Sequence, residues 1–444
     1  MTESTSSNSS STGQHVLSTH PLNSEPSPSS LISSHFITPV SAAYNRNHGE
    51  FKASTSTLTI SSEASGVGTS RSFPLDELKK ARKEEVVAVL VCAGNRRKEM
   101  SEEKETEGLQ WGSALANCQF GGPLLSDILA QVDITLEALE ALGQADKLHL
   151  HFETTQNCEQ DDSFSVSLPI KLALDHSRPV LLAYEQNGQP LEQAHGAPIR
   201  LVVPGVIGAR SVKWLERIVL REYESDGFYQ QRDYKILPPE ATSETKEEYL
   251  KHTPAMMEYP LCAEICEPSD GATVELGTAS SSTLTVKGYA MGAHGIPISA
   301  VHVTFVPLTP PFSPATTTAD SSSIHTSVLA SQLHQIRLAA SSLPSSSWTS
   351  ASLVSTMEQA EGGEKKGWKR GEKQWSWTVW SANVPLPERR DQGNETEVAL
   401  VAYAEDLEGT KQELQTDWNL RGVAEASWSV VRVKLRRGGK AGGA

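Results

Sequence analysis

The feature that most constrains the fold is a change in sequence character near residue 258 of this 444-residue chain. Before it, short runs of apolar and β-branched residues alternate with one stretch of helical spacing, Leu125–Leu142. That alternation predicts an α+β domain over residues 14–257. After it, several segments have strand character and no strong helix lies between them. Five or more short strands in such a span indicate a β-sandwich over residues 258–437.

Three stretches lie at the edges of these two domains or interrupt them. Residues 1–13 are rich in Ser, Thr and Asn and cannot bury enough apolar surface to order themselves. A short tail over residues 438–444 is predicted to be disordered as well. Residues 309–373, approximately, are Ser/Thr-rich and then Gly/Lys/Glu-rich. Because loops of that length are uncommon inside a compact domain, we expect a disordered or partly helical surface insertion there.

Composition excludes several classes of function. The 39 Lys and Arg against 54 Asp and Glu give a net charge of −15, which argues against nucleic acid as the main partner. It does not exclude a small anion, because a cleft can concentrate positive charge inside an acidic molecule. The five cysteines are too few and too scattered for a disulfide-stapled secreted fold. No apolar run approaches the roughly 20 residues of a membrane span, and no secretory, mitochondrial or peroxisomal signal is evident. We therefore expect a cytoplasmic protein without a membrane partner.

Cys92 is the first candidate for chemistry. It follows the continuous run Glu84–Val91, which predicts a buried strand, and it opens the loop CAGNRR with Arg96 and Arg97. Neighbouring guanidinium groups favour the thiolate, which is both the nucleophile and the soft metal ligand. From position alone, an inert buried cysteine is the alternative interpretation.

Six segments, in order, resemble the sulfite oxidase family of molybdopterin-dependent oxidoreductases. They are YNRNHGEF (44–51), VCAGNRRKEM (91–100), LLAYEQNGQPL (181–191), HGAPIRLVVPGVIGARSVKWLERI (195–218), FYQQRDYK (228–235) and WNLRGV (418–423). The resemblance runs from about Pro21 to Leu435, and only the Ser-rich insertion is foreign to it. It implies a molybdopterin-binding catalytic domain over residues 14–257, followed by an immunoglobulin-like sandwich through which the family forms homodimers.

The resemblance also implies how the cofactor is held. Cys92 would be the protein ligand of a molybdenum that also carries a pterin dithiolene. The cofactor-binding residues would be Arg46, Asn47, His48, Cys92, His195, Arg200, Ser211, Val212 and Lys213. Arg210 lies in the same segment, and charge-assisted hydrogen bonds from it would complete a phosphate clamp. Gln156 stands where the family has an aspartate, so that one pterin contact is altered or is moved to Asp161 or Asp162.

The substrate site follows in the same way. An oxyanion would meet several planar cations, which the resemblance places at Arg46, Arg97 and Arg421. Trp111 and Tyr234 would be hydrogen-bonding walls, and with Cys92 these are the catalytic candidates. Glu107 replaces a cation of the family's motif before the tryptophan, which we expect to weaken the local attraction for anions.

We expect oxidation of sulfite to sulfate by oxygen-atom transfer. Sequence motifs typical of haem or flavin modules do not occur in the chain, so we expect the electrons to pass to O2 or to another external acceptor. One alternative is a nitrate reductase-like enzyme, but that branch typically has Asn-Arg at Tyr234-Lys235 and Met at Arg421, so both positions favour sulfite. The other is a catalytically degenerate homologue that acts as a binding protein, for which Glu107, Gln156 and the insertion are the support.

Overall fold

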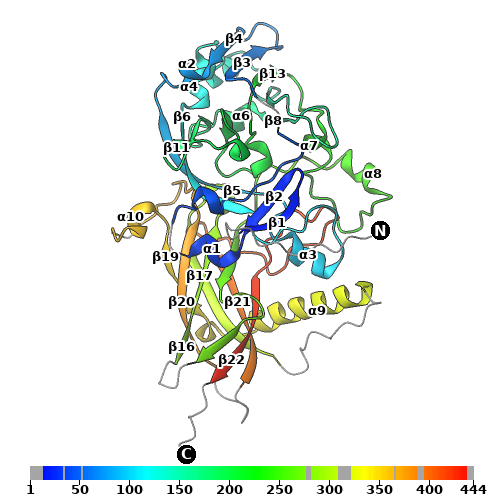
Figure 1. The fold of residues 1–444 in the computed structure, drawn as a ribbon, viewed down its shortest axis with the longest axis vertical. Coiled ribbons are helices and arrows are strands. Elements are labelled where there is room, and N and C mark those ends of the chain that lie inside the picture. The colour runs from blue at the N-terminus through cyan, green and yellow to red at the C-terminus, as the bar shows by residue number, and fades with distance from the viewer. Residues whose placement is uncertain are drawn as a thin grey trace, which may run out of the picture.

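The computed structural model describes residues 14–33, 36–51, 54–276, 282–308, 322–364, 367–387 and 395–437. It has a mixed helix-and-sheet part at one end of its long axis and a β-sandwich at the other (Figure 1). The predicted tails at residues 1–13 and 438–444 lie outside the described residues. No helix in the described ranges is long and apolar enough to cross a membrane.

The mixed part contains a five-stranded sheet with the order β4-β3-β13-β7-β8. β13 runs parallel to β3, and the other pairs are antiparallel. Its strands are β3 (Thr57–Ser62), β4 (Arg71–Pro74), β7 (His149–Glu153), β8 (Ser165–Pro169) and β13 (Arg217–Arg221). Apolar side chains of this sheet join those of short helices in the main core. These helices are α2 (Leu75–Leu78), α4 (Leu125–Ala130), α5 (Leu136–Ala141), α6 (Ile170–Ala173) and α7 (Phe228–Gln231).

A second sheet, β11-β10-β6-β5, carries the chain to Cys92. The predicted strand is confirmed as β5 (Glu84–Val91), and its last four residues are buried. It pairs antiparallel with β6 (Leu115–Gly122), so that Val91 lies opposite Leu115. The remaining elements of this part are β1 (Gln14–Thr19), β2 (Leu22–Pro26), α1 (Pro28–Ile32), η1 (Val40–Ala42), α3 (Arg97–Glu103), β9 (Leu181–Ala183), β10 (Glu185–Gln186), β11 (Gln189–Pro190), η2 (Gln193–His195), β12 (Arg200–Val202), η3 (Gly208–Arg210) and α8 (Lys246–Leu250).

The single helix predicted over Leu125–Leu142 is wrong, because the chain forms α4 and α5 with a break between them. Asp133 adopts a left-handed conformation with φ 59°, which an α-helix cannot contain. The Thr135 side chain then caps α5 by accepting a hydrogen bond from the Ala138 N–H. Apolar spacing continues across the break because Val132 and Ile134 also face the core. The periodicity therefore hid a turn after which the Thr135 side chain caps a new helix.

The second part is a sandwich of two sheets, β14-β16-β20-β19 and β15-β22-β21-β17-β18, as predicted. The strands are β14 (Cys262–Glu267), β15 (Thr273–Leu276), β16 (Thr283–Met291), β17 (Ile298–Pro307), β18 (Thr349–Ser350), β19 (Ser352–Val354), β20 (Thr378–Pro385), β21 (Glu395–Asp406) and β22 (Ser429–Arg437), with η4 (Ala293–Gly295) and η5 (Ser345–Ser347) between them. Side chains from both sheets, such as Trp380 and Leu400, form a separate core.

The span predicted as an insertion, about residues 309–373, is more ordered than its composition indicates. It contains α9 (Ser322–Ser341), the strands β18 and β19, and α10 (Met357–Ala360). β18 pairs with β17 and β19 with β20, so this span completes both sheets. Backbone pairing is insensitive to the many Ser side chains, and Ile336 and Ala340 give α9 an apolar face. Within this span, the chain departs from the sandwich in the connection between β17 and β18, which we call the excursion.

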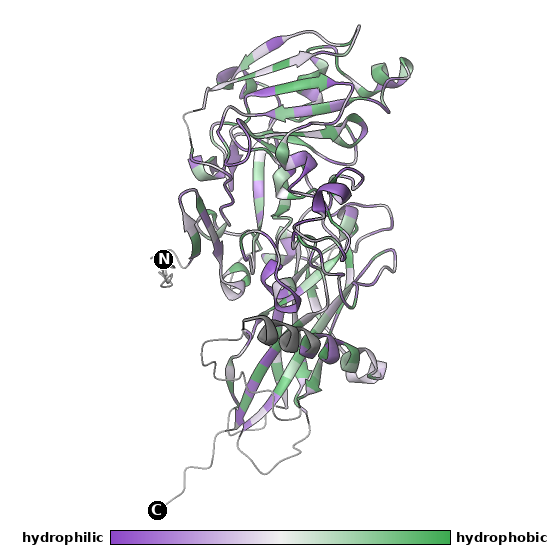
Figure 2. Cartoon of the chain, turned by 90° about the vertical axis from the view of Figure 1, so that its right-hand side faces the viewer, coloured by the Kyte–Doolittle hydropathy of each residue, from purple (hydrophilic) through white to green (hydrophobic). Residues whose placement is uncertain are grey.

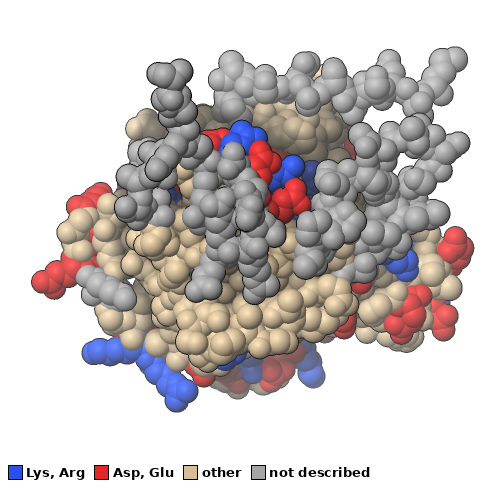
Figure 3. Space-filling model, turned by 90° about the horizontal axis from the view of Figure 1, so that it is seen from below, with Lys and Arg blue, Asp and Glu red and all other residues tan. Residues whose placement is uncertain are grey.

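Apolar and charged residues lie in different places along the fold. Apolar residues gather on the strands at both ends of the molecule, whereas many connecting segments are hydrophilic (Figure 2). Seen from the sandwich end, cations and carboxylates of the described residues lie next to each other (Figure 3). At this end Arg436 of β22 pairs with Glu275 and Glu395 on the neighbouring strands β15 and β21.

Thr135→Ala removes the cap acceptor of α5 and is expected to cost about 1 kcal/mol, which speeds local hydrogen exchange of its amides by about fivefold. Thr135→Ser keeps the acceptor and is the matched control. Hydrogen exchange followed by mass spectrometry on the peptide that contains Leu136–Ala141 measures the effect. Equal exchange in the two variants would mean that the cap does not stabilise α5.

Candidate active site

The predicted cofactor residues converge on one cavity in the mixed part. The cavity lies beside the end of β5 and along β6. The predicted residues that line it are Arg46, Asn47, His48, Cys92, His195, Arg200, Ser211, Val212, Lys213 and Tyr234. Three predicted residues, Arg97, Trp111 and Arg421, are not part of its wall.

Cys92 lies where β5 ends, at the inner side of the cavity. It is buried, and its amide donates to the Ala114 carbonyl at 2.9 Å. Its carbonyl accepts from the Asn95 amide at 2.9 Å, which closes the loop that follows. The thiol packs against Trp111, whose side chain is fully buried. Backbone bonds on both sides therefore fix the direction in which the sulfur points.

The Trp111 indole N–H and the Arg200 Nε–H are buried donors for which the described residues offer no acceptor. Unpaired buried donors are costly and rare in folded proteins. Trp111 packs against Cys92, and Arg200 lines the cavity. Both donors therefore fit a ligand that brings its own acceptor atoms.

His48 and Tyr234 form a pair with a defined proton position. Arg46 contacts His48 Nδ1 at 2.9 Å, and the other ring nitrogen, Nε2, lies 2.7 Å from the Tyr234 hydroxyl. A guanidinium can only donate, so Nδ1 accepts and the proton of neutral His48 resides on Nε2. Desolvation, with the nearby Arg46 and Lys213 charges, holds the His48 pKa well below its ordinary value. The Tyr234 oxygen thus accepts from His48, and its own hydrogen is available to a ligand.

Arg200 and Lys213 line the opposite wall with their charges held in place. Arg200 donates to the His195 and Ser211 carbonyls at 2.8 and 3.2 Å. Lys213 donates to the Arg46 and Ala194 carbonyls, each at 3.0 Å, and to the Asn47 side chain. Desolvation lowers the pKa of Arg200 to about 10 and that of Lys213 well below its ordinary range.

Desolvation also lowers the pKa of His195 to about 3, with Lys213 and Arg200 adding to the effect, so this residue is neutral. Ser211 has a structural bond as well, since its hydroxyl accepts from the Val203 amide at 2.9 Å. The cationic character of this wall therefore comes from Arg200 and Lys213.

Arg97 lies behind the cavity wall and near Cys92. It donates to the Gly422 and Leu109 carbonyls at 3.1 and 2.8 Å. Desolvation lowers its pKa to about 10, against the opposing effect of the Cys92 sulfur. Four cations lie around the cavity, namely Arg46, Arg97, Arg200 and Lys213. None of the four forms an ion pair with another described residue. An anionic ligand would supply the missing counter-charge.

Arg421 differs from these cations because two carboxylates already neutralise it. Its guanidinium contacts Glu107 at 2.8 Å and forms an ion pair with Asp233. Glu107 also accepts from Lys246 at 2.7 Å. Arg421, the predicted third cation of the substrate site, is thus already paired with carboxylates. Glu107 predicts a weaker attraction for anions, but the sequence does not reveal its ion pair with Arg421.

One expectation about the cofactor wall is wrong, and of the two alternatives for the contact at Gln156 the structure favours the altered contact over a moved one. Arg210 does not face the cavity, since its buried guanidinium donates to the carbonyls of Met256 and Tyr229 and to Gln230. Residues of a short η3 turn point in different directions, which adjacency in sequence cannot reveal. Asp161 and Asp162 do not line the cavity either, and Asp161 accepts from the Phe228 amide at 3.0 Å. Gln156 itself lines the cavity.

Sequence reasoning missed part of the wall. Ala116, Cys118 and Phe120 lie on one face of β6 and line the cavity, together with Tyr44 and Gln186. Their alternate spacing along a strand is the signal that could have found them. Gln186 donates to the Cys118 sulfur at 3.2 Å, and desolvation raises the pKa of that thiol to about 11. Cys118 is therefore a neutral wall residue.

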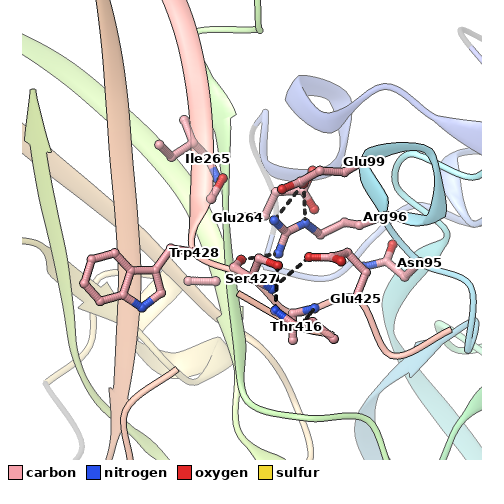
Figure 4. A network of polar contacts seen from close by, with 12 residues as sticks. Asn95, Arg96, Glu99, Glu264, Ile265, Thr416, Glu425, Ser427 and Trp428 are labelled. Carbon is pink, nitrogen blue, oxygen red and sulfur yellow. Dashed lines mark hydrogen bonds and ion pairs between the residues drawn. The ribbon is translucent and has the colours of Figure 1, made fainter. Parts of the chain in front are cut away.

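Behind the Cys92 loop, a buried network joins the two parts of the molecule. Arg96, which has φ 60°, donates to the Glu99 carboxylate at 2.7 Å and to the Ser427 carbonyl at 2.8 Å. Figure 4 shows this guanidinium between Glu99 of α3 and the segment that leads into β22, with Glu425 and Glu264 nearby. The Ala424 amide also donates to the Ala93 carbonyl at 2.9 Å. The sandwich therefore holds the loop from behind.

Comparisons with known proteins agree with this geometry. Residues 47–229 match the oxidoreductase molybdopterin binding domain, and residues 336–436 match the Mo-co oxidoreductase dimerisation domain. Sulfite oxidase from Arabidopsis thaliana is 31% identical over 94% of this chain and 92% of its own length. The chain belongs to the sulfite oxidase family. The two matched models follow each other in the order that the sequence predicts, a molybdopterin-binding domain and then a dimerisation domain.

Other members of the family extend beyond this chain. Human mitochondrial sulfite oxidase is 33% identical over 94% of the chain, which spans 65% of that relative's length. Barley nitrate reductase [NAD(P)H] is 31% identical, and the chain spans 41% of its length. The crystal structure of the sulfane dehydrogenase SoxCD from Paracoccus pantotrophus superposes with a TM-score of 0.64 at 18% identity, covering 94% of this chain and 85% of that one. This last likeness shows the fold.

The residues present fit the molybdopterin group of the family. The cavity brings together the Cys92 thiol, several cations that form no ion pair among the described residues, and the Arg200 Nε–H, for which those residues offer no acceptor. These are the donors expected for a soft metal and for an anionic phosphate. The fit rests on the side chains of this chain and does not depend on the comparisons.

Glu264 gives the stability of the network a pH dependence. Desolvation raises its pKa to about 7, so the folded state binds a proton that the unfolded state has released above its ordinary value of 4.5. Stability from this group is full below pH 4.5 and is lost as the pH rises through about 7. Glu264→Gln, which mimics the protonated acid, is expected to raise the unfolding temperature relative to wild type progressively from pH 5 to pH 8. A pH-independent difference between the two proteins would contradict the assignment.

Proposed function

We propose that this protein oxidises sulfite to sulfate with Mo-molybdopterin and passes the electrons to an external acceptor. The observation that carries the proposal is the pair of guanidinium groups, Arg46 and Arg97, that lie near Cys92 and have no carboxylate partner among the described residues. The cofactor supplies, when bound, oxygen-atom transfer and two-electron redox chemistry. Relatives named sulfite oxidase support the choice of substrate.

The protein's own part is to hold the cofactor and exclude water. Cys92 would ligate the metal from the end of a rigid strand, and Trp111 packs over the same sulfur. Arg200 and Lys213 would pair with the anionic groups of the cofactor, and neutral His195 would act as a hydrogen-bonding partner. Because these side chains are already fixed by backbone carbonyls, little reorganisation is needed on binding.

The substrate is positioned by cations and by one hydroxyl. Arg46 faces the cavity, and Arg97 lies behind it, so that both lower the energy of an oxyanion near Cys92. Tyr234 can donate its hydrogen to the same anion because His48 occupies its oxygen lone pair. Desolvation keeps the Tyr234 pKa above its ordinary value, so the residue stays a donor at neutral pH.

Nitrate reduction is the second candidate, and one observation favours it. Glu107 and Asp233 neutralise Arg421, so two cations rather than three act on the anion. A pocket with less positive charge discriminates less against a singly charged anion. The barley nitrate reductase is 31% identical to this protein over 94% of the chain. Tyr234 remains the argument for sulfite. A degenerate, non-catalytic homologue is disfavoured because the Cys92 thiol lines the same cavity as Arg46, Lys213 and Arg200, whose Nε–H has no acceptor among the described residues.

We also propose a homodimer that forms through the dimerisation domain at residues 336–436. The identity of the electron acceptor, O2 or another molecule, and the cytoplasmic location stay predictions.

Cys92→Ser is expected to lower sulfite turnover at least about a hundredfold, because an oxygen donor in place of sulfur changes the electronics of the metal. Steady-state assays on molybdenum-loaded protein, with sulfite and an electron acceptor and with nitrate and an electron donor, measure the effect. Cys266→Ser, which alters a buried thiol of the sandwich, is the control. Sulfite turnover that survives in Cys92→Ser would refute the role of this thiol, and a preference for nitrate would select the second candidate.

Glu107→Gln removes one of the two carboxylates that neutralise Arg421. One added positive charge at a partly screened site is worth about 1 kcal/mol, so the KM for sulfite is expected to fall about fivefold with kcat little changed. Glu247→Gln, which breaks the exposed pair with Arg232, is the matched control and should not alter KM. An unchanged KM in Glu107→Gln would show that Arg421 does not act on the substrate.

A further inference from the structure

The helix α9 lies in the excursion between β17 and β18, where it runs across the sandwich towards α3 (Figure 1). Ile336 and Ala340 pack on Val306, Ala399 and Val401 of the five-stranded sheet. α9 also contacts α3, the helix that begins at Arg97 directly after the Cys92 loop. The helix therefore bridges the sandwich and the catalytic part.

Arg337 of α9 is buried in this bridge. Its Nε donates to the Trp428 carbonyl at 2.9 Å, and its Nη2 forms an ion pair with Oε1 of Glu99. The other oxygen of Glu99 accepts from Arg96. One carboxylate of α3 is thus shared by two arginines, and these bind the adjacent carbonyls of Ser427 and Trp428.

A short chain of contacts leads from Arg337 to the metal-binding thiol. Glu99 fixes Arg96, whose amide donates to the Gly112 carbonyl at 3.2 Å. The preceding residue, Asn95, donates its amide to the Cys92 carbonyl. Arg96 has a positive φ, a conformation that a non-glycine residue keeps only when its surroundings impose it. The pair of arginines supplies that constraint.

Charge balance gives Arg337 a second role. Glu99, Glu264 and Glu425 all lie close enough to Arg96 to act on it electrostatically. Arg337 is the second cation of this cluster, and it favours the ionised form of Glu425. Without Arg337, one buried arginine would face several carboxylates beside the Cys92 loop. Packing on the sheet explains the apolar face of α9, but it does not explain a buried guanidinium that reaches α3.

We propose that Arg337 is a positioning residue for Cys92: through Glu99 and Arg96 it holds the loop in the conformation that presents the thiol to the metal. The excursion between β17 and β18 is in this way part of the catalytic architecture. The inference rests on the proposed function in that Cys92 is the metal ligand.

Arg337→Met in the full-length holoenzyme is the test, and Arg178→Met is its matched control. Arg178 is also buried and also joins one carboxylate, Glu258 at 2.8 Å, to one carbonyl, that of Pro204, but it does not contact the loop. Two readouts are measured. One is hydrogen exchange of the peptide with Asn95, Arg96 and Arg97, and the other is the electron paramagnetic resonance spectrum of the one-electron-reduced metal.

We expect Arg337→Met to speed exchange of the loop about tenfold and to shift the spectrum, while Arg178→Met changes neither. Arg337→Lys, which keeps a cation opposite Glu99, should restore both readouts in part. If Arg337→Met does not accumulate, Glu99→Gln should give the same changes, because Glu99 is the link to Arg96.

Wild-type exchange and an unshifted spectrum in Arg337→Met or Glu99→Gln would overturn the inference, as would equal changes in Arg178→Met. Failure of the proposed function is distinguishable, because X-ray absorption of the wild type would then show no protein sulfur at the metal. In that case the exchange measurement alone still decides whether Arg337 holds the loop.

Discussion

The structure depends on buried and half-buried positive charges around the Cys92 thiol that form no ion pair among the described residues. Arg46, Arg97, Arg200 and Lys213 are held by carbonyl and amide oxygens, which orient them but do not neutralise them. Burial lowers the pKa of both Arg97 and Arg200 to about 10, so the fold bears the desolvation cost in advance. Such an arrangement is stable only if a ligand returns the missing negative charge.

Rigidity of the backbone turns this charge into a specific site. Cys92 leaves a paired strand, and hydrogen bonds to Ala114 and Asn95 fix the loop on both sides. The sandwich domain also fixes the loop, because the Ala424 amide donates to the Ala93 carbonyl and the Ser427 carbonyl accepts from Arg96. The two domains therefore act as one support for the site. A domain that the family uses for dimerisation also contributes directly to the environment of the thiol.

Much of this could be predicted from the sequence, since contiguous motifs place their residues together. The strand Glu84–Val91 and the change of character between the domains follow from the local sequence, whereas Arg46 and His48 were predicted from the resemblance to the family. Side-chain direction within a short turn follows from neither, which is why Arg210 was misplaced. Partners that are distant in sequence are invisible as well, such as Asp233 and Glu107 for Arg421. The Ser-rich composition left the span of α9 as either disordered or partly helical, and Ile336 and Ala340 mark the apolar face of the helix that forms.

The pairing of β17 with β18 has a consequence for how such a chain can vary. Val303 lies opposite Thr349 in the sheet, although the two are far apart in sequence. The polypeptide leaves and rejoins the sandwich at neighbouring points, and lengthening such a connection costs only about 0.6 kcal/mol for each doubling. Residues can therefore be added to this connection at little cost in free energy, as long as Arg337 of α9 keeps its place against Glu99.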